Sequence, residues 1–300
     1  MKYKHVFFAA FMLLAASCSN DESLDSSVNL SSEQAAAPVT VSVSGFAVEQ
    51  GDFSGTTRAT AVGSYNGVQV LTLAFYKGNG TEQVKVTHTK GSMPEGKTFG
   101  EFTTTLPIGS YTMVVLGYKL YDDDALTLTS PTQAEWTVGA PRETFAVTQE
   151  VNVTNTTALN LSATLSRIVA CLQVVSSDGR TMNVDKVRMT FAAGGKRFSP
   201  TSGLATLNTG SVSIVSVNDA EGATSTSTGY VFLATDQQEM SVTIETLDSE
   251  GNTIFSKTVN DVPFRRNRIT KLTGAIYGAS AEAGSFQVNT EWIGTVNMDF

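Results

Sequence analysis

The pattern of a phosphate-binding P-loop occurs at Gly91–Thr98, which read GSMPEGKT. Such a loop holds phosphate when a helix follows it, because the amides at the start of the helix then face the phosphate oxygens. The next residues, Phe99–Thr105, instead favour a strand, and Glu95 would set a negative charge beside the phosphates. The sequence therefore predicts a plain hairpin loop here and no nucleotide site.

Other residue types capable of chemistry are few and scattered. Asp122–Asp124 could present carboxylates to calcium, but they lack the alternating spacing of a dedicated calcium loop, so a solvated turn is predicted. His88 and Cys171 lie too far apart in the chain to indicate a metal site or a nucleophilic dyad, and the apolar run around Cys171 predicts a buried thiol. We therefore predict no catalytic residue, no metal site and no cofactor, and a protein that is not an enzyme.

Two further features concern possible binding surfaces. Trp136 and Trp292 are the two tryptophans that could form platforms for sugar rings, and Trp292 ends a strand-like run, which favours a position in the core. A basic cluster near the C-terminus comprises Arg265, Arg266, Arg268 and Lys271. Apolar residues alternate with these charges, so the cluster is interpreted as a charged strand edge or outer face.

Alternation of apolar and polar residues with a period of two dominates the chain and predicts β-strands. In Val39–Val43 three valines share one face, and hydroxyl side chains share the other. The other predicted strands are Val68–Tyr76, Glu82–Thr89, Thr98–Thr105, Tyr111–Leu120, Thr144–Val153, Ala158–Leu165, Ile168–Ser176, Val184–Phe191, Ser211–Val217, Gly229–Ala234, Ser241–Leu247, Thr253–Asn260, Arg268–Tyr277 and Gly284–Trp292. Turn residues such as those of Lys77–Gly80 and Ser249–Asn252 separate them.

Helical periodicity is weak, and Pro131–Trp136 is the best candidate for one or two helical turns. Many short strands at this spacing predict an all-β protein with two β-sandwich domains of transthyretin-like or Greek-key type. An Asn- and Thr-rich segment at 152–157 interrupts the apolar pattern and marks the boundary between them. The predicted divisions are a leader at 1–17, a disordered acidic tether at 18–38, and β-sandwich domains at 39–157 and 158–300.

Residues Met1–Ser17 carry two lysines, then an apolar run, and end in small residues, which is typical of a secretory signal peptide. The small residues lead directly into Cys18, and this arrangement resembles the lipobox of bacterial lipoproteins, except that Ala15 stands where leucine is usual. The resemblance implies that cleavage leaves Cys18 as a lipidated N-terminus. An ordinary signal peptide with an incidental cysteine is the alternative.

The residues after Cys18 indicate where the protein resides. Ser19–Glu22 resemble the acidic tag that, in some Gram-negative lineages, directs lipoproteins to the outer face of the outer membrane. Removal of the leader takes away two lysines and leaves 18 basic and 28 acidic residues, a net charge of −10. An exported chain of this charge is a poor candidate for nucleic-acid binding, and no nucleic-acid partner is expected.

Three motifs resemble those of the fimbrillins, the subunits of type V bacterial pili. Val262–Gly274 (VPFRRNRITKLTG) is similar to the signature near the fimbrillin C-terminus. Leu165–Ala170 (LSRIVA) resembles the start of the second fimbrillin domain, and Leu106–Tyr111 (LPIGSY) resembles the beginning of a strand in the first. By the order of these motifs, the chain is identified as a member of the fimbrillin family, of the major, minor or anchor type.

The resemblance implies a mechanism whose parts can be assigned to residues. Fimbrillins are exported as lipoproteins, and a trypsin-like protease cuts them after an arginine near the N-terminus. Removal of the first strand opens a groove, which a strand from another subunit fills. Arg58 is the only arginine between Cys18 and Arg142, and it follows the alternating segment Val39–Val48. Cleavage after Arg58 would release Cys18–Arg58; a plain surface arginine is the alternative.

The function that the resemblance implies is that of a structural subunit of a surface fimbria. It would be held at the outer membrane through Cys18, joined to other pilus subunits by donor-strand exchange, and would contribute to adhesion. Phe286–Phe300 could act as a donor strand or form the final strand of the second domain, and stalk, anchor and tip roles are not separated. The alternative is a surface glycan-binding lipoprotein of a nutrient-uptake system. A third candidate, an exported hydrolase, lacks a recognisable site.

Overall fold

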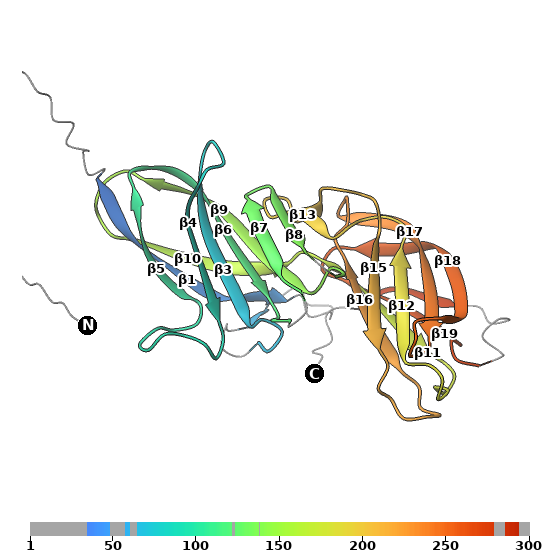
Figure 1. Cartoon of the computed structure of the whole chain (residues 1–300). Coiled ribbons are helices and arrows are strands. Elements are labelled where there is room, and N and C mark those ends of the chain that lie inside the picture. The colour runs from blue at the N-terminus through green and yellow to red at the C-terminus, as the bar shows by residue number, and fades with distance from the viewer. Residues whose placement is uncertain are drawn as a thin grey trace, which may run out of the picture. The chain divides into compact units, whose positions relative to one another are not determined.

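The fold consists of β-strands throughout the part of the chain that the structure describes (Figure 1). The computed structural model describes residues 35–48, 58–60, 65–121, 124–137, 139–278 and 286–293. Within those ranges no helix is long and apolar enough to cross a membrane. The predicted all-β class is confirmed, whereas the leader and most of the predicted tether lie outside the described residues.

One eight-stranded sheet dominates the N-terminal half. Its strands follow the order β2-β1-β10-β9-β6-β3-β4, and β5 pairs with β1. These strands are β1 (Ala36–Val48), β2 (Arg58–Thr60), β3 (Val70–Lys77), β4 (Glu82–Thr89), β5 (Glu101–Pro107), β6 (Gly109–Tyr118), β9 (Thr144–Val153) and β10 (Leu159–Arg167). Side chains from β1, β3, β5, β6, β9 and β10 share one hydrophobic core, so the sheet curls around it.

A small sheet covers the other face of β3 and β6. Its order is β14-β13-β8-β7. The strands are β7 (Leu126–Ser130), β8 (Gln133–Trp136), β13 (Arg197–Ser199) and β14 (Leu204–Ala205). Trp136 and Phe198 from this sheet pack in one cluster with Ala74 of β3 and Leu116 of β6. Because β3 is buried on both faces, its sequence is an almost continuous apolar run.

The prediction of helical turns at Pro131–Trp136 is wrong. Gln133–Trp136 form β8, because the backbone there pairs with β7 on one side and β13 on the other. Ala134 and Trp136 are both fully buried, which is the period-two spacing of a strand. The indole Nε1 of Trp136 donates a hydrogen bond to Thr144 Oγ1 at 3.2 Å, so this tryptophan belongs to the core and offers no platform to a sugar.

Two four-stranded sheets form a β-sandwich in the C-terminal half. Their orders are β16-β11-β19-β20 and β15-β12-β17-β18. The strands are β11 (Ala170–Ser176), β12 (Lys186–Phe191), β15 (Ser211–Ser216), β16 (Thr226–Val231), β17 (Gln237–Leu247), β18 (Thr253–Arg265), β19 (Ile269–Gly274) and β20 (Gln287–Ile293). One hydrophobic cluster includes Leu172 and Leu272 from the first sheet and Met189 and Ile244 from the second, so the two sheets face each other.

The sheets change at a different point from the boundary predicted between 157 and 158. The Asn- and Thr-rich segment joins β9 to β10, and β10 pairs with β1 and β9, so the chain leaves the first sheet only after Arg167. β13 and β14 come from the later half of the chain, yet β13 pairs with β8. Similarly, β1 begins at Ala36, inside the predicted tether 18–38, because its first residues pair with the end of β5.

The loop at Gly91–Thr98 contains no helix, but it is not the hairpin connection that the sequence predicts. β4 before it pairs with β3, whereas β5 after it pairs with β1. The loop therefore joins two strands that are not hydrogen-bonded to each other.

His88 of β4 and Phe102 of β5 stack between these strands, with ring centroids 4.0 Å apart and an interplanar angle of 14°.

Protonation of His88 is disfavoured in the folded protein. Burial lowers the pKa of His88 below its usual value, and the positive charge of Lys97 lowers it further. The Nδ1 atom is buried and has no hydrogen-bond partner among the described residues. The neutral imidazole, stacked on Phe102, is consequently the form that the fold accommodates.

We predict that the free energy of unfolding falls as the pH is lowered from about 7.5 to about 5.5. The histidine of the unfolded chain has the higher pKa, about 6.5, so the unfolded state binds the proton first. The stabilisation is present above that value and is lost as the pH falls through the lower folded pKa. Urea unfolding at several pH values measures the effect. His88→Phe keeps a ring against Phe102 but does not titrate, so its free energy of unfolding should fall less than that of the parent over this pH range. The same fall in both proteins would contradict the assignment to His88.

Candidate functional site

Strand β1 is hydrogen-bonded along both edges although it is the first described strand of the chain. It runs parallel to β10 over Val39–Ala47 and antiparallel to β5 over Ala36–Ser42. Beyond Glu101, the first residue of β5, β2 takes its place and pairs with Phe46–Val48. β1 is thus an interior strand, and its neighbours β5 and β10 lie far from it in the sequence.

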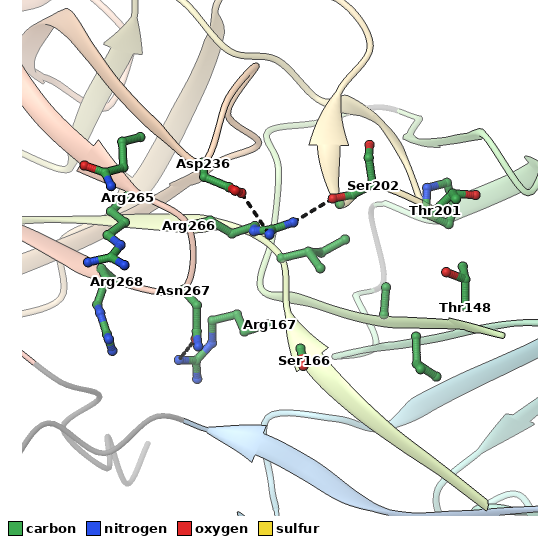
Figure 2. A pocket seen from close by; sticks show the side chains of 16 residues that line it. Thr148, Ser166, Arg167, Thr201, Ser202, Asp236, Arg265, Arg266, Asn267 and Arg268 are labelled. Carbon is green, nitrogen blue, oxygen red and sulfur yellow. Dashed lines mark hydrogen bonds and ion pairs between the residues drawn. The ribbon is translucent and has the colours of Figure 1, made fainter. Parts of the chain in front are cut away.

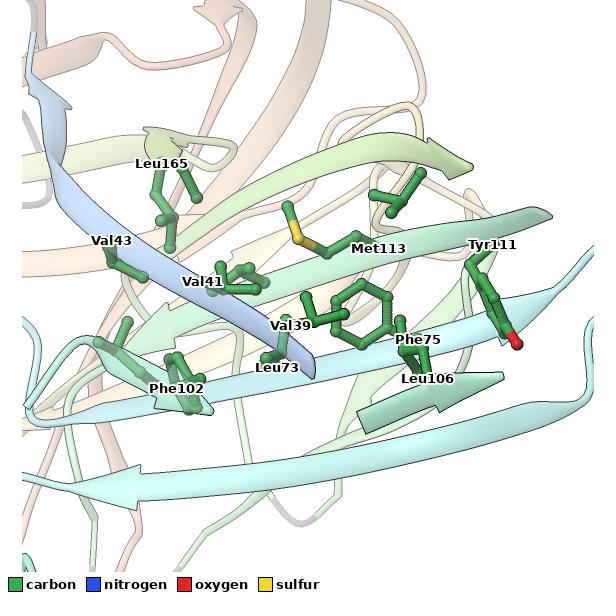
Figure 3. Packing of buried hydrophobic residues seen from close by; sticks show 14 of the residues in the cluster. Val39, Val41, Val43, Leu73, Phe75, Phe102, Leu106, Tyr111, Met113 and Leu165 are labelled. Atoms are coloured by element: carbon green, nitrogen blue, oxygen red, sulfur yellow. The ribbon is translucent and has the colours of Figure 1, made fainter. Parts of the chain in front are cut away.

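The two faces of β1 differ as the alternation in Val39–Val43 predicts. The inward side chains are apolar and buried: Ala37, Val39, Val41, Val43 and Phe46. Figure 3 shows the three valines directed toward the side chains of β3, β5 and β6 in the first core. The threonine and serine between the valines lie on the other face, and this serine is exposed.

Loss of β1 would leave a groove in the first sheet. Its floor would consist of apolar side chains that include Leu73, Phe75 and Met113, and its walls would be the unpaired backbone edges of β5 and β10. Burial of one large apolar side chain contributes about 1.5–3 kcal/mol, and an unpaired sheet edge accepts another strand readily. Without β1, the groove would therefore have an apolar floor and unpaired edges that suit an extended segment with the alternation of β1.

A buried network of aromatic and charged side chains lies beside the end of β1. The rings of Phe46, Tyr65 and Phe145 contact one another, with centroids 5.1–5.4 Å apart. Tyr65 Oη donates to Glu143 Oε1 at 2.9 Å and accepts from Arg167 Nη2 at 3.1 Å. Arg167 and Glu143 form a buried ion pair at 2.6 Å. Phe46 is thereby packed against residues whose positions are held by charge-assisted hydrogen bonds.

The same network reaches the turn between β18 and β19. Arg167 Nη1 donates to Asn267 Oδ1 at 3.4 Å. Burial raises the pKa of Tyr65 above its usual value, and the Glu143 carboxylate raises it further. The phenol therefore stays protonated and donates a hydrogen bond to Glu143. Neither Tyr65 nor Glu143 is among the residues predicted from the sequence. The signal for them was the arginine within Leu165–Ala170, because a buried arginine requires an acidic partner.

The structure describes the backbone of Arg58, the predicted cleavage site, but not Cys18, the predicted lipidation site. Arg58 begins β2, where its backbone pairs with Val48 of β1, and its side chain is not described. β2 is the first strand in the sheet order, so its other edge pairs with no described strand. Cys18 lies outside the described residues. Arg58 is therefore in extended conformation next to the last residue of β1.

The remaining candidates for chemistry have structural partners. Asp124 accepts hydrogen bonds from the backbone N–H groups of Ala125 at 2.9 Å and Gly139 at 2.8 Å, so its carboxylate shapes a turn; residues 122 and 123 lie outside the described part. Burial raises the pKa of the Cys171 thiol to about 12, which makes it unreactive near neutral pH. Among the described residues, no group of three or more His, Cys, Asp or Glu side chains could hold a metal ion.

The C-terminal segment considered as a donor strand forms β20 in the structure. β20 pairs with β19 and stands at the edge of its sheet. Phe286 and Val288 are half-buried and pack against the second core. This arrangement corresponds to the predicted final strand of the second domain, and residues 294–300 lie outside the described part.

Comparison with known proteins identifies relatives at the level of family and fold. The sequence matches a family model, described as a family of unknown function (DUF6562), over residues 33–296. Among curated proteins, none matches the sequence.

Several solved structures superpose on this chain. A candidate adhesin from Bacteroides ovatus has a TM-score of 0.52 at 10% identity, covering 86% of this chain and 94% of that one. A candidate cell adhesion protein from the same species has a TM-score of 0.49 at 12% identity, with 88% and 100% covered. The fimbrial anchor protein Mfa2 from Porphyromonas gingivalis has a TM-score of 0.48 at 12% identity, with 87% and 100% covered. The first of these comparisons shows a shared fold.

We predict that Val41→Ala lowers the free energy of unfolding by about 2 kcal/mol, because two methyl groups leave a fully buried site and a cavity is left behind. Ser42→Ala, at the adjacent exposed position of the same strand, is the matched control and should change stability by less than about 0.5 kcal/mol. Urea unfolding of both variants measures the difference. Equal effects at the two positions would mean that β1 does not complete the first core.

Proposed function

The chain belongs to the DUF6562 family, and from its fold and the packing of its first strand we propose that it is a structural, non-enzymatic subunit of a surface fimbria that takes part in adhesion. The observation that carries this proposal is β1, an N-terminal strand that is paired on both edges and supplies five buried side chains to the first core. The names of its structural neighbours, candidate adhesins and a fimbrial anchor, support the same role.

Assembly would follow from exchange of β1. A segment from another subunit would enter between β5 and β10, form the backbone hydrogen bonds that β1 now makes, and place alternate side chains in the positions of the valines. β1 is suited to this role because it is held by backbone hydrogen bonds to β5 and β10 and by alternate apolar side chains. Another strand with the same alternation could make both kinds of contact. Within this proposal, β20 is a possible donor, since an edge strand with one described partner detaches more easily than an interior one.

Processing would occur after Arg58. Proteases bind their substrates in extended conformation, and the backbone of Arg58 is extended in a strand whose outer edge pairs with no described strand. Cleavage there would separate the segment from Cys18 through β1 from the rest of the chain. If Cys18 carries the lipid, the same cut would free the body from the outer membrane, where the leader and acidic tag would have placed it.

Trypsin-limited proteolysis of the lipid-free precursor tests this proposal. We predict a cut after Arg58 followed by detergent-resistant oligomers, since the new groove accepts a strand from a neighbouring molecule. Arg58→Gln should stay intact and monomeric. Lys97→Gln, which removes an exposed basic residue from the loop at Gly91–Thr98, is the control and should behave as the parent. N-terminal sequencing and size-exclusion chromatography give the readout, and a cut protein that stays a stable monomer would refute strand exchange.

A second prediction concerns the groove itself. A synthetic peptide with the sequence of Ala36–Val48 should bind the cleaved protein and suppress its oligomers, because it restores the original strand. The same peptide with Val41→Asp should not do so, because it would place an unpaired charge in the core. Fluorescence anisotropy of labelled peptides measures the binding. Equal binding of both peptides would show that the groove does not select the alternation of β1.

A further inference from the structure

Four of the nine arginines of this chain line one cavity, which we call the arginine cavity. It has a volume of about 480 Å³ and lies where the starts of β9 and β17 and the end of β10 meet the turn between β18 and β19. The arginines are Arg167, Arg265, Arg266 and Arg268, and Asp236 is the one acidic residue among the lining residues. Figure 2 shows them gathered on one side of the cavity, with Thr148 and Thr201 toward the other.

The turn Arg265–Arg268 concentrates this charge. Arg268 N–H donates to the Arg265 carbonyl at 3.2 Å, and Asn267 adopts a positive φ of 59°, which asparagine tolerates better than most residues. Three of the four residues in this turn are therefore arginines. The basic cluster is predicted to be a charged strand edge or outer face, whereas the structure places its three arginines, though not Lys271, on the wall of a cavity.

Neighbouring residues hold the guanidinium groups of Arg266 and Arg167 in place. Arg266 pairs with Asp236 at 2.8 Å and donates to the Ser202 carbonyl at 2.6 Å. Gly203 makes room for it, because a Cβ at that position would lie 2.7 Å from Arg266 Nη1. Arg167 is held by Glu143, as described above. Their positive charge is therefore largely balanced before any ligand arrives.

Arg265 adds charge that these two acids do not balance. Arg265 is exposed and forms no salt bridge with any residue in the described ranges, and Arg268 is half-buried on the same turn. Positive charges on one turn repel one another. The whole chain has more acidic than basic residues, whereas four arginines and one aspartate line this cavity. A bound anion would relieve that repulsion, and guanidinium forks match the oxygens of carboxylate and sulfate in pairs.

The other lining side chains indicate what carries the anion. Hydroxyl and amide groups come from Thr148, Ser166, Thr201, Ser202, Gln237 and Asn267. None of the described lining residues is aromatic, so a neutral sugar would find no ring to stack on. We propose that the arginine cavity binds an acidic saccharide, whose carboxylate or sulfate groups pair with the arginines and whose hydroxyls meet the hydroxyl and amide groups. A cavity of this volume falls within the range of small-ligand sites.

This inference goes beyond the proposed fimbrial role and does not depend on cleavage after Arg58, so it is tested on the unprocessed chain. Isothermal titration calorimetry would compare a heparin tetrasaccharide, trigalacturonic acid and a neutral galactose trisaccharide. We expect one or both acidic saccharides to bind, with affinity that weakens as sodium chloride is raised, and the neutral one not to bind. Binding of trigalacturonic acid alone would assign carboxylate recognition, and binding of heparin alone would assign sulfate.

The double variant Arg265→Gln/Arg268→Gln should weaken that binding by at least about tenfold, because two charge-assisted contacts are lost. Lys257→Gln, on β18 and absent from the cavity lining, is the matched control and should bind as the parent. Circular dichroism and the melting temperature verify that both variants fold. The proposal is overturned if neither acidic saccharide binds, or if the double variant binds as the parent does. Tighter binding of hexaglutamate than of either saccharide would overturn it in favour of an acidic protein segment.

Discussion

The placement of β1 between β5 and β10 is the constraint on which the rest of the first sheet depends. The strand completes the core with Val39, Val41 and Val43, and it satisfies backbone groups on two neighbours at once. Nothing in those contacts requires that β1 belong to the same chain. What favours the chain's own strand is the covalent connection, which gives it a high effective concentration at the groove. Loss of that connection would place it in competition with any other strand of similar pattern.

Arg167 connects this constraint to the rest of the molecule. It is the last residue of β10, forms a buried pair with Glu143, and contacts Tyr65, whose ring packs on Phe46 of β1. It also lines the arginine cavity and contacts Asn267 in the turn between β18 and β19. The end of the β1 groove and the wall of the cavity therefore share one buried guanidinium group, and the desolvation cost of that charge is offset only while its partners stay in place.

Much of the secondary structure could be predicted from period-two alternation, because each strand carries its own pattern. The predicted bounds of Glu82–Thr89 and Thr144–Val153 agree with β4 and β9 to the residue. The failures have local causes. β8 has four residues, too few to display a period, and β13 and β14 are shorter still. The domain boundary near 157 stays a prediction. It falls at the turn between β9 and β10 of one sheet, and polar turn residues look the same there as between two domains.

By itself, the sequence determined the all-β class, the apolar face of β1 and the scarcity of residues for catalysis, since composition and short-range spacing decide these. Only the tertiary structure decided that β1 is an interior strand and that Trp136 is buried. Only it brought Arg167 to the turn at Arg265–Arg268. The reason is that strand neighbours are chosen by the path of the whole chain, and pairs such as β1 with β10 join segments whose local patterns carry no record of one another.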